Sequence, residues 1–426
     1  MIKRRIIILG GGLAGLSAAR RLQERKISCQ LFEKEDEIGG LCRSKKKNGF
    51  TFDYTGHLLH FRDKTTGNFI RSLLAGNIIE HKRKAWVYTN GSYIHYPFQM
   101  YLHELPAVIA KECIASFPKV RRQESRKNSA HFCEWLKATF GEGIARHFLI
   151  PYNKKFWAYP LEDMTADWTR GFVPVPTSSQ VHNGAKDEKT GYNHTFWYPK
   201  KGGIAALTKA LSSGVRNIRT GCEVKEIDLS KKEIRLCSGG KEKFDYIIST
   251  IPLPELAHII KDLPLKMRNL FDKLRWNSIL NVNLGLNAES GFLRNWVYFS
   301  EPEFSFYRVG FYHTFSPHLA PLGRVSLYAE FAYPMHHMPN QERLIGLIKR
   351  DLKRSGLVVS VDSCVQDINN IRYGYPIYDH NYQRSVKGLT DYLRSKHIFP
   401  CGRYGSWRYL SMSDTVLDGQ KVASGV

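Results

Sequence analysis

The apolar residues near the start of the chain follow the pattern of a strand, a turn, a helix and a second strand. Ile6–Leu9 is a continuous apolar run, and the stretch 10–15 after it has the turn-forming sequence GGGLAG. Residues 16–24 then place Ala and Leu among Arg and other polar residues at helical spacing, and a second apolar run occupies Cys29–Phe32. Short apolar runs bounded by turn signals predict buried strands of one sheet, with a helix between them.

Each glycine of this turn has a physical role in binding a dinucleotide. Gly10 permits the tight turn, Gly12 lets the backbone approach a pyrophosphate, and Gly15 lets the helix lie close to the strand. The helix N-terminus offers unpaired N–H groups to the phosphates. Glu33 ends the second apolar run 18 residues after Gly15, where its carboxylate can accept hydrogen bonds from a ribose. Because these parts agree in order and spacing, a dinucleotide site is favoured over an ordinary glycine-rich turn.

A second glycine-rich turn with a cation indicates which dinucleotide binds. The stretch 39–44, GGLCRS, is followed by 49–57, GFTFDYTGH. The order of the two turns resembles the FAD-binding half of the superfamily of amine oxidases, protoporphyrinogen oxidases, carotenoid desaturases and UDP-galactopyranose mutases. The resemblance implies FAD as the cofactor, with Arg43 near its pyrophosphate and the Gly56–His57 backbone near the isoalloxazine. The cofactor-binding residues that it implies are Gly10, Gly12, Leu13, Ala14, Gly15, Glu33, Lys34, Gly40, Leu41, Arg43, Gly56, His57, Val224, Gly402, Arg403 and Met412.

Three separated segments carry the features of the FAD-binding domain, which is therefore expected to be discontinuous. They are 1–62, then 197–255 with an apolar strand that stops at STIP, and 391–426, where an apolar run meets Gly402. Between them, 63–196 is expected to be a mainly helical insertion and 256–390 a sheet-rich substrate domain. The second insertion contains four stretches that either alternate between apolar and polar residues or are continuously apolar, as strands are: 278–286, 296–299, 306–312 and 324–331. We predict an α/β fold, a Rossmann-type FAD-binding domain with an inserted substrate domain of antiparallel sheet and helices.

The formal net charge of +24 predicts a surface that attracts anionic ligands, nucleic acids or anionic membranes. No nucleic-acid-binding module is visible, so a nucleic-acid partner is not expected. No apolar run reaches the length of a membrane-spanning helix, and the first strand begins too early to follow a cleavable signal peptide. The eight cysteines are scattered without a C-x-x-C pair, so we expect no disulfide framework, no metal site and a cytoplasmic location. Composition leaves the oligomeric state open.

Three further segments resemble UDP-galactopyranose mutases of both the bacterial and the eukaryotic type. They are 151–170, 296–317 and 402–412, with a fourth tyrosine-bearing stretch at 372–376. The resemblance implies contacts with a substrate diphosphate. A planar guanidinium can meet a diphosphate with two parallel hydrogen bonds, and tyrosine hydroxyls add donors without adding charge. The substrate-binding residues that it implies are Trp157, Tyr298, Tyr307, Arg308, Tyr375 and Tyr409, and the catalytic ones are His57, Arg308 and Arg170.

Two positions depart from the mutase pattern. Ser411 stands where bacterial mutases have an aspartate, and Phe172 stands where the mutases have a phosphate-binding arginine. Arg170, two residues earlier, is a candidate substitute for that arginine. The departures leave the identity of the sugar open.

The mutase resemblance implies an FAD-dependent isomerase that interconverts the pyranose and furanose forms of a UDP-sugar for polysaccharide biosynthesis, with N5 of the reduced flavin as nucleophile. NADH and NADPH are candidate reductants. The alternative is an FAD-dependent oxidoreductase of the amine oxidase or protoporphyrinogen oxidase type, in which FAD accepts a hydride. A flavin-bearing binding protein without chemistry is a third hypothesis. A hydride acceptor for an apolar substrate would not need the residues that discriminate the mutase from the oxidoreductase, which are Tyr298, Arg308, Tyr375 and Tyr409.

Overall fold

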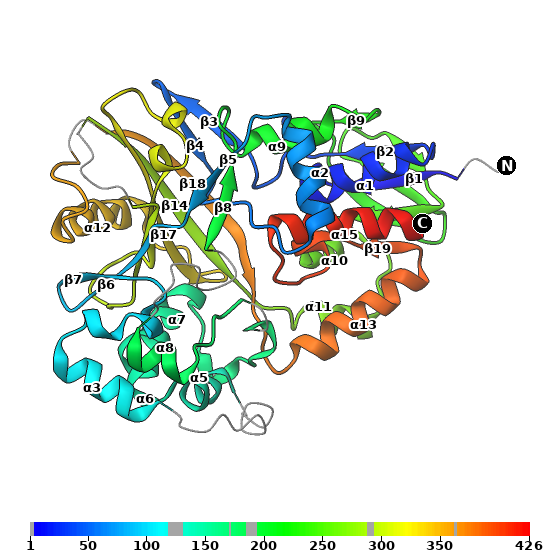
Figure 1. The fold of residues 1–426 in the computed structure, drawn as a ribbon. Coiled ribbons are helices and arrows are strands. Elements are labelled where there is room, and N and C mark those ends of the chain that lie inside the picture. Colours follow the sequence, from blue (N-terminus) through cyan, green and yellow to red (C-terminus); the bar gives the residue numbers. More distant parts are fainter. Residues whose placement is uncertain (1–3, 118–130, 170–171, 185–193, 288–293, 362–363) are drawn as a thin grey trace.

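The structure is a computed structural model that describes residues 4–117, 131–169, 172–184, 194–287, 294–361 and 364–426. Two sheets organise it. A parallel sheet with helices on both faces lies beside a larger mixed sheet, which a group of helices covers (Figure 1). Arg170 lies outside the described residues, so its predicted role has no structural counterpart here.

The parallel sheet is assembled from three distant parts of the chain. Its strand order is β19-β13-β1-β2-β9, and all four pairings are parallel. The strands are β1 (Ile6–Leu9), β2 (Cys29–Phe32), β9 (Ile218–Arg219), β13 (Tyr246–Ser249) and β19 (Ile398–Pro400). β1 is buried along its whole length, as the continuous apolar run requires for a strand covered on both faces.

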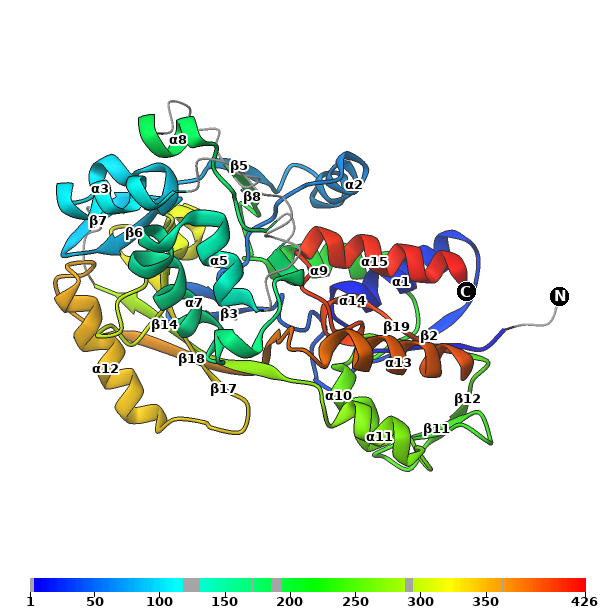
Figure 2. The same cartoon turned by 90° about the horizontal axis from the view of Figure 1, so that it is seen from below.

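Helices cover both faces of this sheet. α1 (Leu13–Glu24) and α15 (Met412–Gly425) lie together on one side, whereas α10 (Leu253–Ile259), α11 (Leu265–Phe271) and α13 (Tyr382–Ser395) lie on the other (Figure 2). α9 (Ala205–Ser212) packs beside α1. A three-stranded antiparallel sheet of β10 (Val224–Asp228), β11 (Glu233–Leu236) and β12 (Lys241–Lys243) adjoins the second layer.

The larger sheet has seven strands in the order β18-β14-β17-β16-β15-β6-β7, antiparallel except for the parallel pair of β15 and β6. The strands are β6 (Ala85–Thr89), β7 (Ser92–His95), β14 (Trp276–Leu286), β15 (Trp296–Phe299), β16 (Arg308–Phe311), β17 (Val325–Pro334) and β18 (Val365–Pro376). α12 (Gln341–Arg354) packs on it through Leu344, Ile348 and Leu352.

Helices cover the other side of this sheet. They are α3 (Ala107–Ser116), α5 (Phe132–Phe140), α6 (Glu142–Ile144), a π-helical turn (Ala145–Leu149), α7 (Ile150–Trp157) and α8 (Ser178–Asn183). Short 3₁₀ turns occur at Phe98–Met100, Leu102–Glu104, Leu161–Asp163, Asp167–Thr169, Tyr312–Thr314 and Pro317–Leu319.

Two two-stranded sheets and two helices join the two parts. The hairpin of β3 (Ser44–Lys47) and β4 (Phe50–Asp53) leads to α2 (Lys64–Leu74), and β5 (Ile79–Lys82) pairs with β8 (Thr195–Tyr198). α14 (Gly402–Gly405) follows β19. The segment 63–196, expected to be mainly helical, therefore also contributes β5, β6, β7 and the start of β8 among its described residues. The alternating burial of β6 explains this difference, because one face of the strand packs on the core while the other stays half-exposed.

Within the described ranges, no helix combines the length and apolarity needed to cross a membrane.

Candidate active site

The turn between β1 and α1 forms an open cradle of backbone. Among the described residues other than its chain neighbours, a Cβ atom built on Gly12, the N-cap of α1, would meet one heavy atom within 4 Å, the Cα of Gly40 at 3.9 Å. Gly40 itself has a positive φ of 55°, which glycine adopts without strain. The first N–H groups of α1 have no side-chain cap and face this space. The cradle therefore has room for a phosphate group where a side chain would fill it.

Two other glycines in this region are required by packing. A Cβ on Gly15 would lie 2.0 Å from the carbonyl oxygen of Gly10, so α1 and β1 approach too closely for any side chain there. A Cβ on Gly402 would lie 2.5 Å from the Cβ of Ala14, and Gly402 also has a φ of +75°. Leu13 and Ala14 are buried at the start of α1. These contacts bring α1, β1 and α14 together around the cradle.

Glu33 lies at the edge of the cradle. Its buried carboxylate accepts hydrogen bonds from the backbone N–H groups of Gly11, at 2.6 Å, and Glu35, at 3.0 Å. Val224, predicted to bind the cofactor, begins β10, and the backbone N–H of nearby Cys222 donates to the Glu33 carbonyl at 2.8 Å. Lys34 points outward, with its Nζ 3.8 Å from a Glu35 carboxylate oxygen.

The second glycine-rich turn closes the other side of the cradle. The Nε of Arg43 donates to the Gly40 carbonyl at 2.8 Å, and its guanidinium lies over the Tyr54 ring, 4.8 Å from the centroid. Leu41 is half-buried beside it. Met412 reaches the same turn, with its Sδ 3.6 Å from the Sγ of Cys42. An open glycine cradle, a helix N-terminus, a carboxylate and a nearby guanidinium fit the phosphates and ribose of a dinucleotide.

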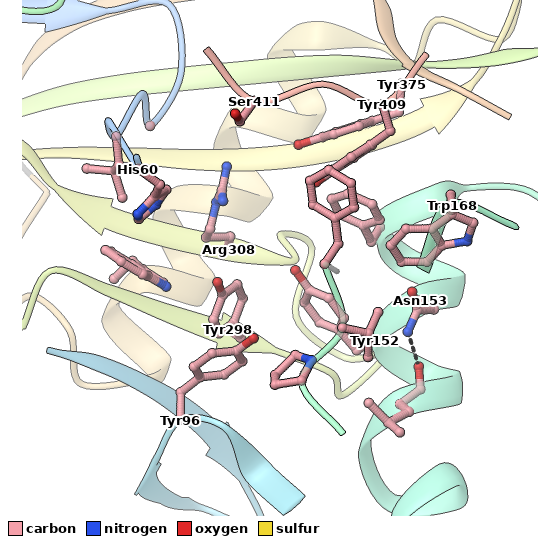
Figure 3. Close-up of a pocket in the computed structure, with 18 of the residues that line it drawn as sticks. His60, Tyr96, Tyr152, Asn153, Trp168, Tyr298, Arg308, Tyr375, Tyr409 and Ser411 are labelled. Atoms are coloured by element: carbon pink, nitrogen blue, oxygen red, sulfur yellow. Dashed lines mark hydrogen bonds between the residues drawn. The ribbon is translucent and has the colours of Figure 1, made fainter. Parts of the chain in front are cut away.

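A cavity of about 290 Å³ adjoins this region. Its wall includes Gly56, His57 and Met412, so it opens beside the residues expected to contact the flavin. Other lining residues come from the large sheet, from the helices that cover it, and from the segments 55–60 and 403–412 beside the parallel sheet. Figure 3 labels His60, Tyr96, Tyr152, Asn153, Trp168, Tyr298, Arg308, Tyr375, Tyr409 and Ser411. The lining also includes Gln99, Phe132, Phe148, Phe156, Phe172, Trp296 and Arg403.

Arg308 extends from β16 into the cavity, between His60 and the tyrosines (Figure 3). Its Nε and one Nη donate to both carboxylate oxygens of Glu330, at 2.7 and 2.9 Å. Glu330 is fully buried on β17, directly opposite Arg308 in the antiparallel register. Burial alone would lower the pKa of Arg308. The negative charge of Glu330 and the nearby tyrosines have a larger opposite effect, so the pKa of Arg308 lies well above its usual value. The guanidinium is therefore a permanent cation with one edge already bound.

Two tyrosines and a second arginine form another wall. The rings of Tyr375 and Tyr409 stack with centroids 5.5 Å apart, and Arg403 lies over both, at 4.6 and 4.8 Å. The Nε and one Nη of Arg403 are buried and have no hydrogen-bond partner among the described residues. Burial raises the pKa values of Tyr375 and Tyr298, so both hydroxyls remain neutral donors.

The two histidines of the wall carry no charge near neutral pH. Burial, followed by the charge of Arg403, lowers the pKa of His57 to about 4. Burial also lowers the pKa of His60 to about 4. Positive charge at this site therefore comes from arginines.

Two of the predicted substrate residues lie behind the cavity wall. Trp157 is fully buried and donates its indole N–H to Asn153 at 3.2 Å. Tyr307 is also buried, edge-to-face against Phe156 at 5.3 Å. The structure thus places both as supports for wall residues.

Several wall residues have no counterpart in the sequence prediction. Tyr152 and Asn153 fall in the mutase-like segment 151–170, in which the resemblance implies roles only for Trp157 and Arg170. Gln99 donates to the Pro174 carbonyl at 2.7 Å, and no sequence signal marks it. The ion pair of Glu330 with Arg308 depends on the register of β16 and β17, and the sequence does not specify how these strands pair.

The two positions that depart from the mutase pattern have structural roles here. Ser411 is the N-cap of α15, and its hydroxyl forms a capping box with Asp414. Phe172 lies in the cavity wall with its ring edge-to-face against Tyr409, at 4.5 Å, and the Arg62 guanidinium lies over it.

Comparison with known proteins agrees with this geometry. Residues 13–424 match the family described as flavin containing amine oxidoreductase. A crystal structure of a reduced UDP-galactopyranose mutase superposes with a TM-score of 0.92, at 27% identity over 99% of this chain and 95% of that one. A putrescine oxidase bound to putrescine superposes with a TM-score of 0.68 at 15% identity, over 99% of this chain and 98% of that one, which shows a shared fold.

Curated relatives match over shorter stretches. The dTDP-fucopyranose mutase of Escherichia coli is 24% identical over 171 residues, 38% of this chain and 44% of that protein. The 4,4'-diapolycopene oxygenase of a Methylomonas species is 50% identical over 50 residues, 12% of this chain and 10% of that protein. The chain thus spans less than half the length of either relative in these matches. The predicted α/β fold and the predicted resemblance are confirmed, and a flavin-containing family implies FAD. The chain belongs to the family of flavin-containing amine oxidoreductases.

Proposed function

We propose that the protein is an FAD-dependent nucleotide-sugar mutase that interconverts the pyranose and furanose forms of a UDP-linked or similar sugar. The observation that carries the proposal is the cavity wall, where Arg308 lies among neutral tyrosine hydroxyls beside the Gly56–His57 backbone. The 27% identity to a reduced UDP-galactopyranose mutase along nearly the whole chain supports it, as does the match to dTDP-fucopyranose mutase.

The chain's own residues bind and orient the substrate in this proposal. Arg308 supplies a fixed positive charge to the diphosphate, with Glu330 holding the guanidinium at two points. Tyr298, Tyr375 and Tyr409 add hydroxyl donors, and their rings exclude water from the reacting end of the cavity. Preorganised donors of this kind stabilise the charge of a departing diphosphate without reorganising.

FAD would be held by the cradle around Gly12 and Gly40, with Glu33 at the ribose and Arg43 at the pyrophosphate. When bound and reduced, it supplies an electron-rich nitrogen that can act as a nucleophile toward an anomeric carbon. The neutral His57 and the Gly56 backbone border that face of the cavity, so they would position the cofactor without placing charge beside it. NADH and NADPH are the candidate sources of the electrons.

The test is a turnover assay with controlled redox state. Purified protein is reduced with dithionite under nitrogen and incubated with UDP-galactose and, separately, with dTDP-fucose, and the products are separated by chromatography. The mutase is supported if the furanose product forms only after the protein has been reduced and if its formation does not continue to consume reductant. Bleaching of oxidised FAD by an amine, porphyrinogen or polyene, with no sugar conversion, would show an oxidoreductase instead.

Substitutions connect that activity to the cavity. Tyr375→Phe removes one wall hydroxyl while keeping the ring that stacks on Tyr409, so conversion should slow with little change in stability. Arg71→Ala is a matched control, because Arg71 stacks on Phe61 and Trp197 on the α2 surface rather than lining the cavity.

A further inference from the structure

Three loops that contain no acidic residue meet at one edge of the large sheet. They are the hairpin 44–50 (SKKKNGF), the segment 198–203 (YPKKGG) and the segment 315–324 (FSPHLAPLGR), which precedes β17. None of their residues lines the cavity. The β3–β4 hairpin lies at the upper edge of the molecule in the view of Figure 1. The cavity therefore leaves the chemistry of these loops unexplained.

Direct contacts hold the three loops together. At the hairpin turn, Gly49 has a φ of +83°, and a Cβ built on it would lie 3.0 Å from the Cγ of Pro321. The hydroxyl of Ser316 donates a hydrogen bond to the backbone carbonyl of Lys200. One loop thus contacts both of the others, and the charges on all three belong to one surface.

Five side chains on this surface carry exposed positive charge. Lys45 pairs with Asp367 at 3.2 Å, whereas Lys47 donates to a neutral group, the backbone carbonyl of Gln366, at 2.7 Å. In the part of the chain that the structure describes, no carboxylate forms an ion pair with any of the five. They are Lys46, Lys47, Lys200, Lys201 and Arg324.

A fully exposed leucine stands among these cations. Leu322 has a relative exposure of 103%, and it lies between Pro321, which packs on the hairpin turn, and Gly323. A single exposed leucine is ordinary on a protein surface. A leucine that protrudes beside several unpaired cations is different, because an aliphatic side chain can enter the acyl boundary of a bilayer while lysine and arginine meet anionic headgroups.

The same loops lack what a nucleic-acid surface would need. Single strands bind by stacking their bases on exposed aromatic rings beside a basic groove. The aromatic residues of the three loops are all buried: Phe50, Tyr198 and Phe315. An exposed aliphatic side chain offers a base no stacking partner. The combination of charge and leucine therefore favours a lipid surface.

We propose that this basic surface, formed by Lys46, Lys47, Lys200, Lys201, Arg324 and Leu322, docks the protein on a membrane that contains anionic phospholipid. Leu322 enters the bilayer at headgroup level, and the five cations meet the lipid phosphates. The docking is peripheral, and it does not depend on the nucleotide-sugar function proposed above.

The experiment measures how the FAD-loaded protein binds large unilamellar vesicles, by flotation, at low and at moderate salt. One set of vesicles is phosphatidylcholine alone, and the other is equal parts of phosphatidylcholine and phosphatidylglycerol. Wild type should bind the anionic vesicles and not the neutral ones. Salt should weaken this binding, because it screens exposed charges.

Two variants separate the contribution of charge from that of the leucine. The double substitution Lys46→Ala and Lys47→Ala should weaken binding to anionic vesicles at least about 10-fold and flatten its salt dependence. Leu322→Ser should weaken binding roughly 5-fold with the salt dependence unchanged, because it removes only apolar contact. Leu322→Trp should restore the affinity, because tryptophan favours the membrane interface.

Matched controls come from α11, which covers the parallel sheet. The double substitution Lys266→Ala and Lys273→Ala removes two other exposed lysines, and Leu265→Ser removes a leucine that is 72% exposed. Neither change should alter vesicle binding. All of the substituted side chains are exposed, so the variants should fold like wild type.

Several results would overturn the proposal. They are an absence of binding to anionic vesicles at low salt, equal losses in the α11 controls, and wild-type affinity in Leu322→Ser. A duplex oligonucleotide that binds through Lys46 and Lys47, with no binding to vesicles, would show a nucleic-acid surface and overturn it too.

Discussion

Gly12→Ala is expected to abolish tight FAD binding while leaving the apoprotein about as stable as wild type. Gly12 has extended backbone, with φ −76° and ψ −175°, which any residue adopts. In the part of the chain that the structure describes, its added Cβ would meet the Cα of Gly40 alone, at 3.9 Å, an ordinary van der Waals distance. The protein without a ligand therefore has room for the methyl group. A ligand in the cradle would clash with that group.

The expected change in unfolding free energy is small because two effects oppose each other. Alanine is a poorer N-cap than glycine, by about 0.5–1 kcal/mol. Replacing glycine at a compatible backbone conformation stabilises by about 0.4–1 kcal/mol, because the unfolded chain loses freedom. The net change should lie within about 0.5 kcal/mol. FAD affinity should fall at least about 10-fold, which corresponds to roughly 1.4 kcal/mol.

Gly15→Ala is the matched control. It adds the same methyl group one turn later, where the Cβ would lie 2.0 Å from the carbonyl oxygen of Gly10. That oxygen belongs to the backbone, so no side-chain rotation relieves the contact and α1 must move away from β1. Overpacking of this kind costs about 1–3 kcal/mol or more, against about 1 kcal/mol gained from helix propensity. The apoprotein itself should therefore be destabilised.

Urea unfolding of the two apoproteins and fluorescence titration with FAD distinguish the cases. The expected pattern is a Gly12→Ala protein that folds normally but stays colourless, and a Gly15→Ala protein that unfolds at lower urea. Wild-type FAD affinity in Gly12→Ala would refute the placement of the pyrophosphate in this cradle. Equal destabilisation by both substitutions would show that the space above Gly12 is not free in solution.

Further predictions concern the buried carboxylates. Glu330→Gln should lower the unfolding free energy by about 3 kcal/mol, because it leaves the half-buried Arg308 cation without its counter-charge. Glu242→Gln, in the surface pair with Arg219, should change the unfolding free energy by less than about 1 kcal/mol. Equal effects of the two substitutions in urea titrations would refute this difference between buried and surface pairs. Burial raises the pKa of Asp53 to about 6, against opposing hydrogen bonds from Ser44 and Tyr198. Between pH 4 and pH 6 the folded protein keeps a proton on Asp53 that the unfolded chain has lost, so stability should fall by about 3 kcal/mol as pH rises through this window. Asp53→Asn should remove that slope, and an unchanged pH profile of unfolding in the variant would contradict the assignment.

The nucleotide framework could be predicted from sequence because its determinants are local. Gly10, Gly12 and Gly15 define one turn, and the positions of Ile6–Leu9 and Cys29–Phe32 follow from the length of the helix between them. Strand β15 also has the predicted bounds, because a short apolar run between polar segments specifies both of its ends. Each of these features depends on a few consecutive residues and on the period of the pattern.

The cavity could not be predicted in the same detail because it depends on register and helix rotation. Arg308 meets Glu330 because β16 and β17 pair at that register, across an intervening segment of 3₁₀ turns. Tyr152, Asn153 and Phe156 of α7 line the cavity, whereas Trp157, one turn after Asn153 and hydrogen-bonded to it, lies beyond the cavity in the core. A change of one residue in register or of one helical position would reverse such assignments, and sequence periodicity does not fix either.

The pairing of Arg308 with Glu330 also changes how the site can recognise a diphosphate. Guanidinium recognition is strongest when two parallel N–H groups meet two oxygens of one anion, and Arg308 directs its Nε–Nη2 edge to Glu330 in that manner. Because Arg308 also lines the cavity, the proposed diphosphate would be met by the N–H groups that Glu330 leaves over rather than by that edge. The same Glu330 carboxylate lies 3.5 Å from the backbone N–H of Gly56, in the loop expected beside the flavin. Glu330 thus fixes the Arg308 guanidinium relative to the Gly56 loop, on the cofactor side of the cavity, and a ligand that reached Arg308 would meet a cation that is already oriented.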